Sequence, residues 1–115
     1  MQVEYNFRWF KRNADYFDDW FDPNTFEWGR SRYLAEYCSE HFNKWWNSKK
    51  YHWSWSDKLA SHCSKDFKIW FDAEKYNWDD SLDPLIQNCI THIDIWYDPN
   101  IFTKSYDELL IESIK

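Results

Sequence analysis

Residues 16–40 read YFDDWFDPNTFEWGRSRYLAEYCSE, and the pattern of residue types in this stretch returns along the chain. Residues 41–65 read HFNKWWNSKKYHWSWSDKLASHCSK, and residues 66–90 read DFKIWFDAEKYNWDDSLDPLIQNCI. A last copy starts near residue 92 and reads HIDIWYDPNIFTKSYDELLIESIK. Self-similarity at one fixed period is typical of repeat architectures. We therefore predict a single domain over residues 1–115, with repeats at 16–40, 41–65, 66–91 and 92–115.

The copies align in columns of matching residue types, and such columns are typical of a core. One column is tryptophan in every copy: Trp20, Trp45, Trp70 and Trp96. Two further columns are aromatic throughout: Phe21, Trp46, Phe71 and Tyr97, then Phe26, Tyr51, Tyr76 and Phe102. A leucine column holds Leu34, Leu59, Leu85 and Leu109, and a cysteine column holds Cys38, Cys63 and Cys89.

Each copy carries the end signals of two helices. Asp22 is a helix-capping residue followed by proline, and the aromatic residues Phe21 and Phe26 flank the start of the predicted helix as a hydrophobic staple. These signals predict a short helix at roughly 23–28. Ser31 provides a second cap, after which apolar residues recur at helical spacing, which predicts a longer helix of ~15 residues. The expected fold is all-α: a short solenoid of about four short-helix/long-helix repeats.

The composition agrees with a packed helical chain. The sequence holds one Gly and three Pro, which argues against a turn-rich β fold, and its 43% hydrophobic content argues against disorder. Residues 1–15 fit the repeat only in part, so we expect them to cap the first repeat. Leucine and isoleucine residues between 109 and 114 are expected to close the other end.

Charge and cysteine usage limit the partners and the compartment. Residues 41–68 carry 6 basic and 2 acidic side chains, whereas residues 69–115 carry 3 basic and 10 acidic ones. The acidic half disfavours DNA or an anionic membrane there and suits a basic protein surface. Three cysteines, an odd number, and the lack of a long apolar run favour a cytoplasmic protein without a membrane span.

The string WFDPNTFEWGRSRYLAEYCSEHFNKWW resembles Trp-rich repeats of the type FDKWWDPxxFNWxxSxxLAxYCSxHF, which occur in proteins of bacteria, phages and other viruses. The resemblance covers roughly residues 16–97 and weakens after Lys104. It implies no known activity. By analogy with its small, compact size, it points to phage accessory proteins, including small inhibitors of host defence enzymes such as anti-CRISPR proteins.

Catalysis and metal binding find little support in the sequence. A single glycine, Gly29, rules out a glycine-rich phosphate loop, and no nucleophile-elbow motif occurs, so we expect no enzyme and no cofactor. Cys38 with His41, and Cys89 with His92, have zinc-ligand spacing. The cysteines form a repeat column while the histidines do not, which favours core packing over a metal site.

A surface stripe that varies between copies favours protein binding. Along each predicted long helix, one stripe at i, i+4 and i+8 changes from copy to copy, and repeat proteins commonly vary the surface that meets a partner. Together with Trp55 and an acidic turn, this stripe supplies the predicted partner-binding residues: Tyr33, Tyr37, His41, Trp55, Lys58, His62, Asp66, Asp79, Asp80 and Asp83. We expect a non-enzymatic protein-binding module that acts by steric block or acidic mimicry. The alternative is a single-stranded nucleic-acid-binding protein that uses the basic, aromatic residues 41–68.

Overall fold

The computed structural model describes residues 6–79 and 81–113, and all regular structure in these ranges is helical. The α-helices are α1 (Phe7–Asn13), α2 (Phe17–Trp20), α3 (Arg32–Tyr37), α4 (Phe42–Trp45), α5 (Ser56–His62), α6 (Phe67–Trp70), α7 (Leu82–Asn88), α8 (Ile93–Trp96) and α9 (Tyr106–Ser113). Short 3-10 helices are η1 (Ala14–Tyr16), η2 (Trp28–Arg30), η3 (Ser39–His41), η4 (Trp53–Trp55), η5 (Ser64–Asp66) and η6 (Ile90–His92). The all-α class predicted from the sequence is confirmed.

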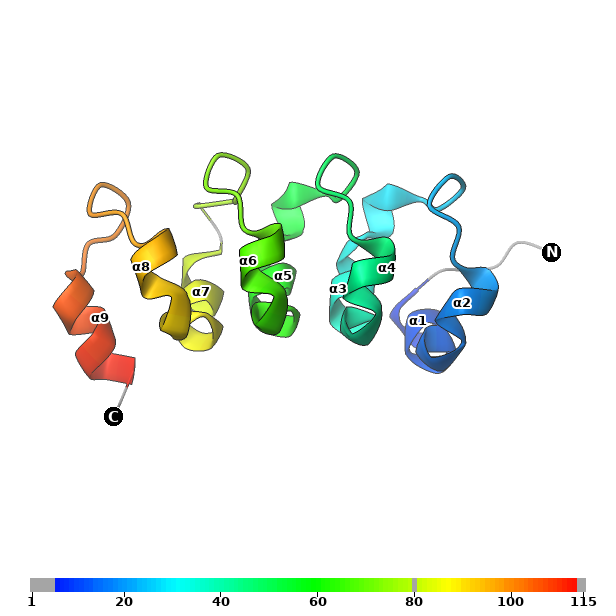
Figure 1. Cartoon of the computed structure of the whole chain (residues 1–115), viewed down its shortest axis with the longest axis horizontal. Helices are drawn as coiled ribbons and strands as arrows, with labels where there is room; N and C mark the ends of the chain where they lie inside the picture. Colours follow the sequence, from blue (N-terminus) through cyan, green and yellow to red (C-terminus); the bar gives the residue numbers. More distant parts are fainter. Residues whose placement is uncertain (1–5, 80, 114–115) are drawn as a thin grey trace.

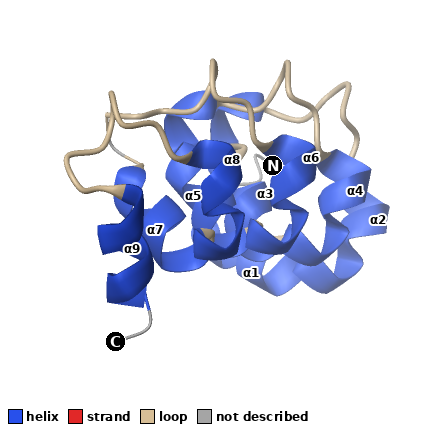
Figure 2. Ribbon diagram, turned by 60° about the vertical axis from the view of Figure 1, so that its left-hand side comes forward, coloured by secondary structure: helices blue, strands red, loops and turns tan. Residues whose placement is uncertain are grey.

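The helices are arranged along an elongated body of 53 × 27 × 21 Å. Helices α1, α3, α5, α7 and α9 follow one another along the long axis, and α2, α4, α6 and α8 lie beside them (Figure 1). The loops that follow the second set of helices gather along one edge of the molecule (Figure 2). Consecutive copies of the sequence pattern therefore lie next to one another in space.

The predicted long helix is wrong, because the chain breaks at the cysteine column. Cys38 has φ −120° and ψ 26°, outside the helical range, and separates α3 from η3 and α4. Its carbonyl oxygen accepts a hydrogen bond from the backbone N–H of His41 at 2.9 Å, and a second from Trp45 Nε1 at 2.7 Å. An unbroken helix would bond this carbonyl to the N–H of residue 42 instead. The tryptophan side chain thus satisfies the carbonyl that the break releases.

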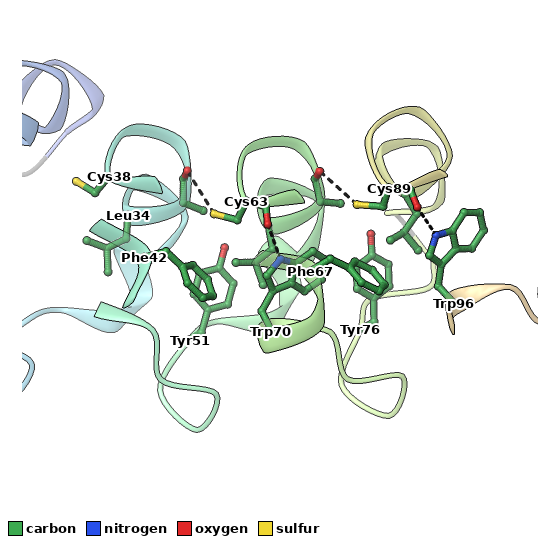
Figure 3. Close-up of a cluster of buried hydrophobic side chains, with 14 of the residues drawn as sticks. Leu34, Cys38, Phe42, Tyr51, Cys63, Phe67, Trp70, Tyr76, Cys89 and Trp96 are labelled. Atoms are coloured by element: carbon green, nitrogen blue, oxygen red, sulfur yellow. Dashed lines mark hydrogen bonds between the residues drawn. The ribbon is translucent and has the colours of Figure 1, made fainter. Parts of the chain in front are cut away.

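The same break recurs in the following copies. Trp70 Nε1 donates to the Cys63 carbonyl, and Trp96 Nε1 donates to the Cys89 carbonyl, each at 2.7 Å (Figure 3). Trp45, Trp70 and Trp96 are all buried. The invariant tryptophan column therefore has a structural explanation: it fills the core and stabilises the corner between two helices.

The predicted short helix at 23–28 is also wrong, although its capping residue acts as expected. Asp22 Oδ1 accepts from the backbone N–H of Asn24 at 2.9 Å, and the Asp22 carbonyl accepts from Phe26 N at 2.9 Å. These bonds close one turn, and the chain then runs on into η2. The staple contact is confirmed, with the Phe21 and Phe26 ring centroids 5.6 Å apart.

The serine column links neighbouring copies rather than capping its own helix. Ser31 makes no capping hydrogen bond to α3; its Oγ accepts from the backbone N–H of His52, 2.9 Å away in the next copy. Ser56 Oγ accepts from Asn77 N in the same way at 3.1 Å. At the last copy, Ser105 does cap its helix, because its Oγ accepts from Glu108 N at 3.2 Å.

Helix α1 makes one contact that the later copies also make, which the partial sequence match did not predict. Trp20 Nε1 donates to the Asn13 carbonyl at 2.8 Å, the bond that Trp45 makes to Cys38 one copy later. Asn13 lies 25 residues before Cys38, and Trp9 occupies the leucine column. Residues 6–13 therefore share this contact with the later copies, and α1 packs against α3 of the first copy.

Candidate protein-binding face

The α3–α5 surface brings together side chains from two copies of the repeat. We call this group the Arg32 cluster; its members are Arg32, Tyr33, Glu36, Tyr37, Trp55 and Lys58. Helix α3 supplies the first four residues, η4 supplies Trp55, and α5 supplies Lys58. The cluster forms because α3 and α5 are packed neighbours, with Leu34 and Leu59 fully buried behind it. All six members are half-buried.

Aromatic rings surround the Arg32 guanidinium. Its Cζ lies 4.3 Å from the ring centroid of Trp55 and 5.2 Å from that of Tyr33. A guanidinium within about 6 Å of a ring centroid is attracted by the negative face of the ring, by about 0.5–1 kcal/mol when exposed. Arg32 Nε is shielded from solvent and has no hydrogen-bond partner among the described residues. The N–H at Arg32 Nε therefore donates no hydrogen bond within the described residues.

A carboxylate lies between two cations beside these rings. Glu36 Oε1 is 3.1 Å from Arg32 Nη2 and 3.1 Å from Lys58 Nζ. The Glu36 side chain is only 10% exposed, so solvent screens this network less than an ordinary surface ion pair. Through Glu36 the network links α3 to Lys58 of α5.

The predicted stripe on α3 is partly used inside the molecule. Tyr33 stacks on Phe10 of α1 with ring centroids 5.1 Å apart, and Tyr37 stacks on Tyr33 at 6.4 Å. His41 lies parallel to Phe17 at 4.8 Å, and its Nε2 is 3.1 Å from the Ala14 carbonyl oxygen. The stripe therefore packs against the preceding copy through Tyr33 and His41, and it also faces solvent.

The remaining predicted residues are spread over other elements. His62 is exposed at the end of α5, and Asp66 is half-buried at the end of η5. Asp83 is exposed on α7, and Asp79 is exposed in the loop before it. Asp80 lies outside the described residues. The structure thus joins Tyr33, Tyr37, Trp55 and Lys58 into one cluster and leaves the acidic turn as a separate feature.

The cysteine column is packed and not reactive. Cys63 Sγ lies 3.9 Å from the Ala35 carbonyl oxygen, and Cys89 Sγ lies 3.7 Å from that of Ala60, so each thiol points at the preceding copy (Figure 3). Burial raises the pKa of the Cys63 thiol to about 12. A thiol with such a pKa supplies almost no thiolate at neutral pH for nucleophilic attack or metal binding. Among the described residues, no group of three or more His, Cys, Asp or Glu has the geometry of a metal site.

Comparison with protein-family models, with curated proteins and with solved structures gives no match for the chain. Within residues 6–79 and 81–113, no helix is both long enough and apolar enough to cross a bilayer. The fold and the cluster define the class: an all-helical protein with a polar, aromatic face.

Sequence reasoning missed Arg32 and Glu36, which are central to the cluster. Their i, i+4 spacing is that of an ordinary helix-surface ion pair and carries no functional signal by itself. Trp55 and Lys58, which complete the cluster, come from the next copy. Considering position 32 of one copy together with the variable residues of the following copy would have located the Arg32 cluster.

Proposed function

We propose that the chain is a short helical solenoid that binds another protein through the Arg32 cluster and catalyses no reaction. One observation carries the proposal: the buried columns repeat, while the exposed and half-buried positions of α3 and α5 differ. Tyr33 and Tyr37 of α3 correspond to Lys58 and His62 of α5. A constant framework with a changing face is how repeat proteins build specific binding surfaces.

The chemistry of the cluster also favours a protein partner. Tyrosine, tryptophan and arginine dominate the energetically important residues of protein interfaces. A rigid aromatic ring buries a large area at a low entropic cost, and its polar tip remains available for a hydrogen bond. The acidic residues of the 69–115 half, including Asp79 and Asp83, would attract a basic protein surface and speed association with it. The nucleic-acid-binding surface of a host defence enzyme has this chemistry.

The test compares two double variants in affinity capture. Tyr37→Ala with Trp55→Ala removes the outer rings of the cluster, whereas Lys68→Ala with Ile69→Ala changes exposed residues of α6 as a matched control. We expect a partner captured by the wild type to bind the control equally and the cluster variant at least about tenfold more weakly. Equal binding by both variants would rule out the Arg32 cluster as the contact.

A second candidate function rests on the loop edge. Lys50 Nζ lies 5.9 Å from the Trp28 ring centroid, and Lys75 Nζ lies 5.9 Å from that of Trp53. Alternating cations and rings are typical of surfaces that bind single-stranded nucleic acid. Binding of a labelled oligothymidine that weakens steeply with salt, and is lost in Lys50→Glu with Lys75→Glu, would favour this candidate over protein binding.

A further inference from the structure

The first helix has one flank that no described element covers. Helix α1 packs against α3, and its tryptophan bond from Trp20 to Asn13 places it in the repeat register. Lys58 of α5 reaches back to Glu36 of α3, and Tyr33 of α3 reaches back to Phe10 of α1. In α3 and α5 this position therefore points toward the preceding copy.

In α1, the backward-pointing position is occupied by an arginine. Arg8 lies 25 residues before Tyr33, and Arg8, Lys11 and Arg12 are all exposed. Helix α1 contains no acidic residue and is therefore positively charged, while the exposed acids Asp15, Asp18 and Asp19 follow it in η1 and α2. Tyr16 lies 25 residues before His41, whose ring stacks on Phe17 of the preceding copy, and Tyr16 itself is 61% exposed. Among the described residues, α1 and η1 thus place Arg8 and Tyr16 where Tyr33 and His41 contact the preceding copy.

The last helix carries the opposite charge at the other end. Leu109 of α9 corresponds to Leu34, so Ile111 takes the place of Glu36, the residue that faces the next copy in α3. Ile111 is 53% exposed. Helix α9 contains Asp107, Glu108 and Glu112 and no cation, although Glu112 pairs with Lys104 of the preceding loop at 2.7 Å. Helices α1 and α9 are thus opposite in charge, and each exposes an apolar side chain, Phe7 in α1 and Ile111 in α9.

We propose that a second copy of this chain docks end to end, with α1 of one molecule packing on α9 of the next as α5 packs on α3 within one molecule. The inference rests on the repeat register and not on the partner proposed for the Arg32 cluster. Such a contact joins two different surfaces, so each molecule can add a further one and association need not stop at a dimer. One pair of short helices buries less than the ~1,000 Å² of a stable interface, so the association is weak and salt-sensitive.

The test is sedimentation velocity of the full chain with charge reversal at each end. Arg8→Glu with Arg12→Glu gives α1 a net negative charge like that of α9, and Asp107→Lys with Glu112→Lys gives α9 a net positive charge like that of α1. We expect wild-type mass to rise with protein concentration and to fall with salt, and each variant alone to associate about tenfold or more weakly. Mixing the two variants, or combining all four substitutions in one chain, should restore association.

A control variant separates end-specific contacts from net charge. Lys65→Glu with Lys68→Glu changes the net charge as much as the α1 variant, at exposed residues of the middle copies. It should associate much as the wild type does, and circular dichroism should show every variant to be helical. A wild type that remains monomeric at all concentrations would overturn the proposal. So would end variants that associate as well as the wild type, or mixtures that do not associate.

Discussion

The tryptophan column shows how one side chain stabilises a corner of the chain. Trp70 is 1% exposed, and its Nε1–H donates to the Cys63 carbonyl inside the core. Trp78, in the neighbouring tryptophan column, makes an analogous bond to the Ala73 carbonyl at 2.8 Å, but on the surface. The two bonds differ in environment far more than in length. A hydrogen bond that is lost in the core costs more, because water cannot replace it.

Trp70→Phe should therefore destabilise the protein more than Trp78→Phe. Both substitutions remove the indole N–H and a similar ring volume. We expect about 2–3 kcal/mol for the buried residue and less than about 1 kcal/mol for the half-buried one. Urea unfolding followed by far-ultraviolet circular dichroism gives both values. Equal losses would mean that the Cys63 carbonyl finds another donor, and that the column is conserved across copies for ring volume alone.

At the scale of elements, the serine column holds consecutive copies together. Ser56 Oγ accepts from Asn77 N in the following loop and also donates to the Trp53 carbonyl. Ser81 occupies the same place one copy later and is fully buried, but its Oγ has no hydrogen-bond partner among the described residues. After Phe102 the last copy is two residues shorter than the others.

Ser56→Ala and Ser81→Ala form a matched pair that tests this role. Alanine at 56 leaves the Asn77 N–H without its acceptor, and we expect a loss of about 1–2 kcal/mol. Alanine at 81 removes a buried hydroxyl that already lacks a partner, so the change should lie within about 0.5 kcal/mol or be stabilising. Thermal unfolding of the two variants side by side decides the point. A larger loss at 81 would show that its hydroxyl has an acceptor or donor in solution.

Across the whole molecule, the helices differ in how many neighbouring helices cover them. Helix α5 packs against both α3 and α7, whereas α9 packs against α7 at the end of the elongated body (Figure 1). In such a quasi-one-dimensional arrangement, stability is close to a sum of contacts between adjacent units. The ends therefore open at a lower free energy than the centre.

Native-state hydrogen exchange should show this gradient directly. We expect the slowest exchange in α5, around the fully buried Leu59, and progressively faster exchange toward α1 and α9. Mass spectrometry of peptic fragments resolves these segments. Leu59→Ala, which should cost about 2–5 kcal/mol, is expected to speed exchange in α3 and α7 as well. Uniform protection along the chain would instead indicate a single cooperative unit.

The sequence by itself determined the helical class, the repeat period and the capping role of Asp22, although not that the chain makes a turn there in place of a helix. These features rest on residue spacing and on bonds between neighbours only two to five residues apart, such as Asp22 with Asn24 and Phe21 with Phe26. A short stretch of sequence contains both partners of each such contact, so its pattern is sufficient to predict them.

Only the tertiary structure decided where the helices break and which side chains share a face. The break at Cys38 depends on a tryptophan that folds back across the corner to bond its carbonyl. The Arg32 cluster depends on Trp55 and Lys58, which come from the next copy and reach Arg32 and Glu36 only when α3 and α5 are packed side by side. Contacts between copies are set by packing geometry, and residue spacing within one copy does not contain that information.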